Sequence, residues 1–329
     1  MMEKRNWTSF HLYYAEPWEA LLSNFLKPWV DKHLEENELF FFIRYWEKGP
    51  HIRFRMAAEP NRLKGLSNEL KSAFEHYVLE NPSERMLDAF QPEDREFIAK
   101  EWYPNNSIQA IAYDPEVSRY GGVYGLAISE KHFQHSSQYA LEAFAEDEEW
   151  DYNAAFAAAL QAHVLMCKAF GMSAEDMQRF FYVVCMSWYP RASRVHWEAL
   201  TQEEQKARKE EIFDAYMQQY QSQEENIKPY VLELFHSSDV ELQEGIETYA
   251  FSWYQSSQEI AAELERTFNQ GLLEDPGWIK SILGNELPEH QKAIWAIYSS
   301  YVHMTNNRLG LDNSDEGFLA YVIMNCFKS

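Results

Sequence analysis

Cysteine is scarce in this chain, and its cysteines do not follow a metal-binding pattern. The 329 residues include only Cys167, Cys185 and Cys326, an odd number without CxxC spacing. A disulfide framework or a structural zinc site therefore has no support, and we expect three buried free thiols. The GxGxxG, GKS/T, HExxH and GxSxG motifs are also missing, so the nucleotide-binding, metallohydrolase and serine-hydrolase classes lack their usual support.

Long apolar runs are missing too. The longest uncharged apolar stretch, Phe180 to Pro190, is well short of the roughly 20 residues that a membrane helix needs. The N-terminal segment MMEKRNWTSFHLYY places charge before a short alternating pattern and lacks the apolar region of a signal peptide. We therefore expect a soluble cytoplasmic protein without a membrane span.

Positive charge is in short supply. The chain has 29 Lys plus Arg against 52 Asp plus Glu, which gives a formal net charge of -23 at pH 7. Such a surface repels phosphate backbones and lacks the basic footprint of nucleic-acid-binding proteins, so we expect no direct nucleic-acid partner. Residues 1–60 carry 8 Lys plus Arg and 9 Asp plus Glu, so this segment concentrates the positive charge of the chain.

The pattern of the first half predicts a small β-sheet. Aromatic and alternating segments predict strands at residues 7–14, 38–46, 51–58 and 107–113. The turn-like Glu47-Lys48-Gly49-Pro50 joins the second and third of these as a β-hairpin. Helices are expected from Pro17 to about His33 and over residues 60–80, where Leu63, Leu66, Leu70, Phe74 and Val78 recur at helical spacing.

The second half reads as almost wholly helical. Amphipathic patterns predict helices at about 137–147, 152–170, 174–188, 199–220, 223–236, 242–270, 287–308 and 314–327. Sheet-forming segments followed by helices indicate an α+β protein. We expect an N-terminal antiparallel β-sheet lobe at about 1–130 and a largely α-helical lobe at about 131–329, in which His163, Met166, Met177 and Met186 pack in the core.

Three places carry residues that are suited to chemistry. Alternation in a strand puts His51, Arg53 and Arg55 on one face, as a cationic ladder or as ordinary surface arginines. Glu116 and Arg119 are spaced for a local ion pair just before Gly121 and Gly122.

The third place lies near the C-terminus. There His303 lies among the hydroxyl and amide side chains of the helix YSSYVHMTNNRLG, with Gly310 as the expected helix cap. A helical histidine in such surroundings is either a satisfied polar residue or a group that transfers protons.

Four segments together resemble a known family. In chain order, WTSFHLYY, FFFIRYWEKGPHIRFRM, YDPEVSRYGG and SSYVHMTNNRLG resemble signature segments of the glutamate-elimination domain of class I lanthipeptide dehydratases, also called the thiopeptide-type bacteriocin biosynthesis domain. The resemblance covers nearly the whole chain. It implies one elimination domain over residues 1–329, acting apart from the glutamylation half of the larger dehydratases.

The resemblance implies a function and its residues. A partner protein esterifies Ser or Thr of a precursor peptide with glutamate from glutamyl-tRNA, and the elimination domain expels glutamate to give dehydroalanine or dehydrobutyrine. Matching positions assign this lyase chemistry to Arg53, Arg55, Glu116, Arg119 and His303. His303 is then the base at Cα or the acid that protonates glutamate. No metal or organic cofactor is implied, and a lanthionine cyclase is a compatible further partner.

Two other functions remain open. A pyridine synthase of thiopeptide biosynthesis resembles the same fold, but it joins two dehydroalanines in a formal [4+2] cycloaddition and expels no glutamate. A non-catalytic scaffold of this fold would only dock the precursor peptide to a modification complex. The complete set of arginines, glutamate and histidine favours elimination.

Overall fold

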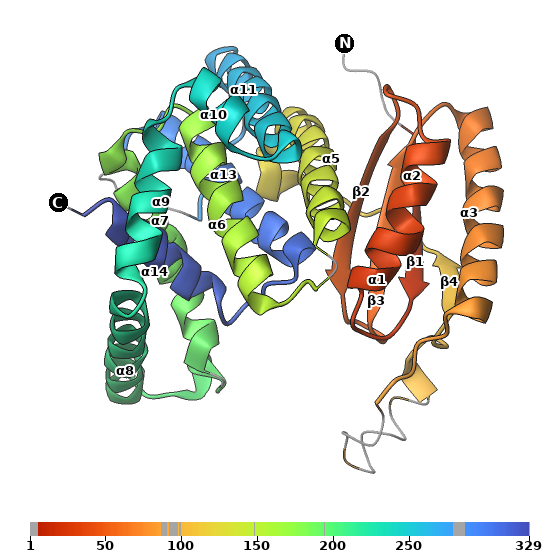
Figure 1. The fold of residues 1–329 in the computed structure, drawn as a ribbon, viewed down its shortest axis with the longest axis horizontal. Helices are drawn as coiled ribbons and strands as arrows, with labels where there is room; N and C mark the ends of the chain where they lie inside the picture. The colour runs from red at the N-terminus through yellow and green to blue at the C-terminus, as the bar shows by residue number, and fades with distance from the viewer. Residues whose placement is uncertain are drawn as a thin grey trace. The chain divides into compact units, whose positions relative to one another are not determined.

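The computed structural model describes residues 6–86, 91, 98, 100–147, 149–193, 195–278 and 287–328. The chain folds as two compact units. Unit 1 comprises Met1–Pro115 and Ser136–Trp150, and unit 2 comprises Glu116–His135 and Asp151–Ser329. Figure 1 shows the sheet of unit 1 and the helices of unit 2. The expected α+β class, an N-terminal antiparallel sheet followed by a mostly helical region, is confirmed.

Unit 1 is built on a four-stranded antiparallel sheet. The strands β1 (Trp7–Tyr13), β2 (Leu39–Tyr45), β3 (His51–Ala57) and β4 (Ser107–Ala110) lie in the order β2-β3-β1-β4. The predicted hairpin is confirmed as β2 and β3, and its turn places Lys48 at φ 59° and Gly49 at φ 107°. The β4 strand ends earlier than expected, since its pairing with β1 stops at Ala110.

Helices cover one face of this sheet (Figure 1). They are α1 (Glu19–Leu21), the π-helical turn η1 (Leu22–Leu26), α2 (Lys27–His33) and α3 (Pro60–Glu80). The Trp29 ring of α2 packs edge-on against Phe54 of β3. The predicted apolar stripe of α3 is buried, so apolar burial holds these helices on the sheet.

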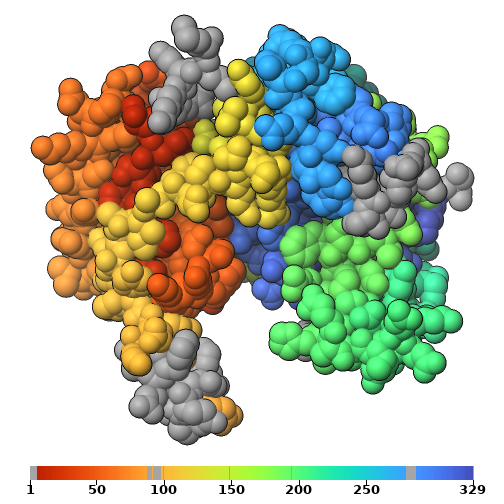
Figure 2. Space-filling view, turned by 180° about the vertical axis from the view of Figure 1, so that it is seen from behind, coloured from red at the N-terminus to blue at the C-terminus, as the bar shows by residue number. Residues whose placement is uncertain are grey.

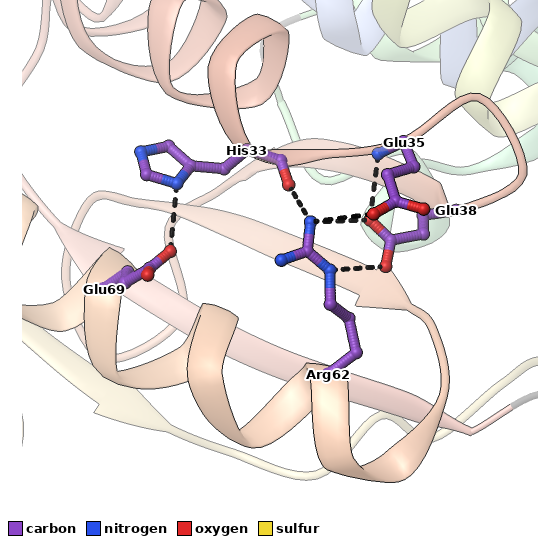
Figure 3. Close-up of polar contacts among 5 residues, drawn as sticks. All are labelled: His33, Glu35, Glu38, Arg62 and Glu69. Atoms are coloured by element: carbon purple, nitrogen blue, oxygen red, sulfur yellow. Dashed lines mark hydrogen bonds and ion pairs between the residues drawn. The ribbon is translucent and has the colours of Figure 1, made fainter.

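Polar contacts join α2, the segment before β2 and α3 (Figure 3). Arg62, in the first turn of α3, donates from Nε to Glu38 Oε1 at 3.1 Å and from Nη2 to the backbone carbonyl of His33. His33 Nδ1 lies 2.9 Å from Glu69 Oε2. Because the Glu38 side chain is 7% exposed, its pairing with Arg62 compensates a buried carboxylate where the chain enters β2.

Unit 2 is helical. Its elements are η3 (Val117–Tyr120), the first half of α5 (Gly122–Glu146), α6 (Tyr152–Ala169), α7 (Ala174–Trp188), η4 (Tyr189–Ser193), η5 (Trp197–Ala199), α8 (Gln202–Gln221), α9 (Glu224–His236), α10 (Asp239–Gly245), α11 (Thr248–Asn269), α13 (Glu289–Leu309) and α14 (Glu316–Cys326). Most side chains of α13 are buried, including polar ones. This helix therefore lies inside the unit and must find partners for its polar groups.

Two predicted helices have the wrong ends. The helix expected at 137–147 begins at Gly122, because Gly121 ends η3 in the left-handed conformation and α5 follows at once. A Cβ atom on Gly125 would lie 1.9 Å from the Tyr120 carbonyl oxygen, so only glycine at this position permits the tight start of the helix. The helix expected at 242–270 is divided into α10 and α11, since a capping box at Ser238 starts α10 early and Ile246 is extended.

The buried groups agree with the expectations from composition. The three cysteines are free and buried, and burial raises the pKa of Cys185 to about 12 and that of Cys326 to about 11. His163, Met166 and Met177 are buried, whereas Met186 is partly exposed. No helix within the described residues is long and apolar enough to cross a membrane.

The other face of the sheet holds two stacked histidines. The rings of His11 and His51 lie 4.6 Å apart, on neighbouring strands. Burial, together with the nearby His51 and Arg53 side chains, lowers the pKa of His11 to about 3, and burial lowers the pKa of His51 to about 4. Both imidazoles are therefore neutral in the folded protein near neutral pH.

These histidines should make the protein less stable in acid. Between their ordinary pKa of 6.5 and about 4, the unfolded chain binds protons that the folded sheet excludes, so the free energy of unfolding falls as pH falls. Urea denaturation from pH 7 to pH 4 should show a slope that the double variant His11→Gln/His51→Gln reduces by up to about 1.4 kcal/mol per pH unit for each histidine. The exposed control His76→Gln should keep the wild-type slope. Equal slopes in all three proteins would contradict the assignment.

Candidate functional site

Arg53 lies on the polar face of the hairpin. Its guanidinium stacks on the Tyr45 ring at 3.4 Å, and its Nη2 lies 3.4 Å from Glu47 Oε2. The Nδ1–H of His51 donates to the Gly49 carbonyl at 2.7 Å, so the lone pair of Nε2 accepts from Arg53 Nε at 3.3 Å. The neutral histidine thus orients an arginine whose side chain is 20% exposed.

Arg55 lies on the same face, two residues further along β3. It is 8% exposed, and its guanidinium lies over the rings of Tyr113 at 4.5 Å and Phe41 at 5.2 Å. The register of β1 places Ser9 opposite Arg55 and His11 opposite Arg53. The two arginines therefore share a face rich in aromatic rings and buried polar groups, which suits an anionic ligand.

Glu116 and Arg119 lie at η3 of unit 2. Arg119 Nε donates to Ser300 Oγ of α13 at 3.1 Å, and Arg119 Nη1 lies 3.5 Å from Glu116 Oε2. The expected ion pair is present. After it, Gly121 has φ 80°, and a Cβ atom there would lie 2.9 Å from Ile297 Cδ1 of α13. The glycine allows η3 to approach α13 closely enough for Arg119 to reach Ser300.

His303 lies on α13, near the cap at Gly310. Its Nδ1 lies 2.7 Å from Glu316 Oε1 at the first residue of α14, and its ring stacks on Trp188 of α7 at 4.5 Å. The His303 side chain is 18% exposed and that of Glu316 is 1% exposed. The imidazole is held on two sides and still reaches solvent.

A cavity of about 500 Å³ lies beside these residues of unit 2. Its lining comprises Ser118, Arg119, Ser187, Trp188, Arg191, Pro276, Trp278, Ser299 and Ser300. In Figure 2 the blue of α13 is visible between the yellow segment that includes η3 and the green segment around the end of α7. The volume lies in the range of small-ligand pockets, and two arginines give the cavity a preference for anions.

The predicted residues fall into two groups. Arg53 and Arg55 lie in unit 1, whereas Glu116, Arg119 and His303 lie in unit 2. Within unit 2, Arg119 lines the cavity, and His303 stacks on Trp188 in the wall of the same cavity. Their catalytic roles remain predictions at this point.

Sequence reasoning missed Arg191, Trp188 and Glu316. Arg191 and Trp188 come from the end of α7 and from η4, which the sequence pattern marked only as a helix end. The sequence offered one signal for Glu316, because an acidic side chain in the first turn of a helix interacts favourably with the helix dipole. Its partner could not be read from the sequence. Among the described residues, no group of three or more His, Cys, Asp or Glu side chains is placed to hold a metal ion.

Comparisons with known proteins agree with this architecture. The structure is similar to a pyridine synthase of thiomuracin biosynthesis, TbtD, with a TM-score of 0.67, 16% identity and coverage of 98% of this chain and 97% of that one. It is similar to TsrL, with a TM-score of 0.63, 16% identity and coverage of 98% and 95%. A comparison with curated protein sequences gives no match.

A third structure is a part of a larger enzyme. The tRNA-dependent lantibiotic dehydratase MibB from Microbispora sp. 107891 matches with a TM-score of 0.55 and 17% identity over 99% of this chain and 28% of that enzyme. At these identities the likenesses show the fold alone. The family model for the C-terminal region of lantibiotic biosynthesis dehydratases matches residues 7–327. The chain therefore belongs to the lantibiotic dehydratase C-terminal domain family.

Proposed function

We propose that this chain is a lyase that eliminates glutamate from glutamylated Ser and Thr residues of a ribosomally made precursor peptide. The products are dehydroalanine and dehydrobutyrine. A separate protein that uses glutamyl-tRNA supplies the glutamyl ester, because a surface with a net charge of -23 is unsuited to holding tRNA. Membership of the family supports a peptide substrate and lyase chemistry.

One observation carries the proposal. A single cavity of unit 2 combines an arginine held in place, Arg119, with a histidine in contact with its wall, His303. The arginine supplies a planar cation for a carboxylate, and the histidine supplies a group that transfers protons near neutral pH. Elimination of glutamate requires both functions.

The chemistry assigns the base to His303. Glutamate leaves as a carboxylate, which is a competent leaving group, so the difficult step is removal of the Cα proton next to the amide carbonyl. Because the contact with Glu316 occupies Nδ1, Nε2 is the nitrogen that remains for the proton. We therefore infer that His303 removes the Cα proton and that Arg119 stabilises negative charge.

In unit 1, we assign Arg53 and Arg55 to the binding of anionic groups of the precursor peptide. Arg53 is partly exposed and oriented by His51, so it is the better placed of the two to bind a carboxylate directly. Arg55 is buried between aromatic rings and adds positive charge to the same face. Glu116 is exposed and orients Arg119, or it binds the ammonium group of the glutamyl residue.

A pyridine synthase is the second candidate. The likeness to TbtD spans both chains almost end to end, whereas the chain spans 28% of MibB. An assay with a chemically glutamylated peptide separates the candidates. Release of one glutamate per dehydroamino acid supports elimination, whereas ring formation from a peptide that already carries dehydroalanines supports a synthase. Binding without either product supports a scaffold.

The protein alone should not dehydrate an unmodified precursor peptide. We expect no loss of water when it is incubated with peptide, glutamyl-tRNA and the tRNA-charging system, because the proposed glutamylation step belongs to a partner. Mass spectrometry of the peptide measures the outcome. Loss of one water per Ser or Thr under these conditions would contradict the division into two proteins.

Removing the histidine should trap glutamylated peptide. His303→Ala should lower the rate of glutamate release on the order of 10²- to 10⁴-fold, the usual contribution of a positioned base, and saturating peptide should not restore the rate. The exposed histidine variant His76→Ala is the matched control and should retain the wild-type rate. A wild-type rate for His303→Ala would remove His303 from the reaction.

Removing Arg53 should act differently. Arg53→Ala weakens the binding of an anionic substrate, so KM should rise and a higher peptide concentration should recover part of the rate. Arg179→Ala removes an exposed arginine of α7 and is the control for loss of positive charge. If Arg53→Ala leaves kcat/KM unchanged, the polar face of the sheet does not bind the substrate.

A further inference from the structure

Glu316 is a buried carboxylate that the proposed mechanism uses only through its contact with His303 Nδ1. It is the first residue of α14, its side chain is 1% exposed, and it accepts hydrogen bonds at both oxygens. Oε1 lies 2.7 Å from His303 Nδ1, and Oε2 accepts from Asn306 Nδ2 at 3.1 Å. Burial of a carboxylate costs free energy unless such partners compensate it. Packing alone therefore does not account for a glutamate at this position.

The direction of the hydrogen bonds can be followed from His163. Burial lowers the pKa of this histidine to about 4, so it is neutral and carries one proton. Its Nε2 lies 2.7 Å from Asn306 Oδ1, an oxygen that can only accept, so the proton is on Nε2. The amide of Asn306 is thereby oriented, and its Nδ2 donates to Glu316.

We propose that Glu316 is a positioning residue that fixes the tautomer of His303, with the proton on Nδ1 and the lone pair on Nε2. An acceptor at Nδ1 favours the protonated Nδ1, and this leaves Nε2 as the base that removes the Cα proton. The same carboxylate stabilises the imidazolium that forms after proton transfer. The inference rests on the proposed elimination function and names the group that prepares its base.

A second histidine–glutamate pair, between His290 of α13 and Glu265 of α11, gives a matched control. His290 Nε2 lies 2.7 Å from Glu265 Oε2, but these side chains are 39% and 44% exposed. The two pairs have the same separation and differ in burial, in the imidazole nitrogen that meets the carboxylate and in the position of the histidine along α13. Glu265→Gln therefore reports what loss of a histidine–carboxylate contact does outside the proposed site.

The test uses Glu316→Gln, which keeps the size of the side chain. Because Asn306 still donates to the oxygen, the new amide nitrogen faces His303 and donates to Nδ1, which moves the ring proton to Nε2. With ¹⁵N-labelled histidine, the His303 signals are identified by their absence in His303→Ala. They should show a protonated Nδ1 in the wild type and in Glu265→Gln, and a protonated Nε2 in Glu316→Gln.

Kinetics test the consequence for the reaction. Glu316→Gln should lower kcat on the order of 10²- to 10⁴-fold with little change in KM, because the wrong nitrogen is protonated. The double variant His303→Ala/Glu316→Gln should be no slower than His303→Ala, since the two residues act as one unit. Additive losses, or an unchanged tautomer in Glu316→Gln, would overturn the positioning role. A wild type that shows the predicted tautomer but releases no glutamate would contradict the proposed function alone.

Discussion

The burial of α13 is the constraint on which the helical unit depends. Most of its side chains are inside the unit, and several of them are polar, so these groups need partners within α13 or on neighbouring elements. Ser300 accepts from Arg119 of η3, and His303 and Asn306 both contact Glu316 of α14. The buried helix α13 therefore determines where Arg119 and His303 lie beside the cavity.

The same rule shapes the sheet of unit 1. Apolar residues of β1 and β3 pack under the helices, and His11, Arg53 and Arg55 alternate to the other face. There the histidines are neutral because burial lowers their pKa, and a neutral His51 can accept a hydrogen bond from Arg53. Burial thus keeps His51 in the neutral form that supports the positive charge of Arg53. In each unit, buried polar groups hold the candidate residues in place.

Much of the fold could be predicted because it follows from local patterns. Period-two alternation identified the hairpin, and helical spacing identified α3 with its five buried residues. The start of α5 could not be predicted, because the approach of Gly125 to the Tyr120 carbonyl is a tertiary contact. Resemblance to a family supplied the candidate residues. The contacts of His303 with Glu316 and Trp188 join segments far apart along α7, α13 and α14, and no local pattern encodes them.

In the proposed reaction, His303 removes the Cα proton of a glutamylated residue. The most direct measurement is single-turnover release of glutamate from two glutamylated peptides, one of them deuterated at Cα of the reacting serine. We predict two results. In His303→Ala, where proton removal limits the rate, the deuterated peptide releases glutamate more slowly than the undeuterated peptide. With either peptide, His303→Ala releases glutamate much more slowly than the wild type. Equal rates for the two peptides in both proteins, with no loss of rate in His303→Ala, would contradict this role of His303.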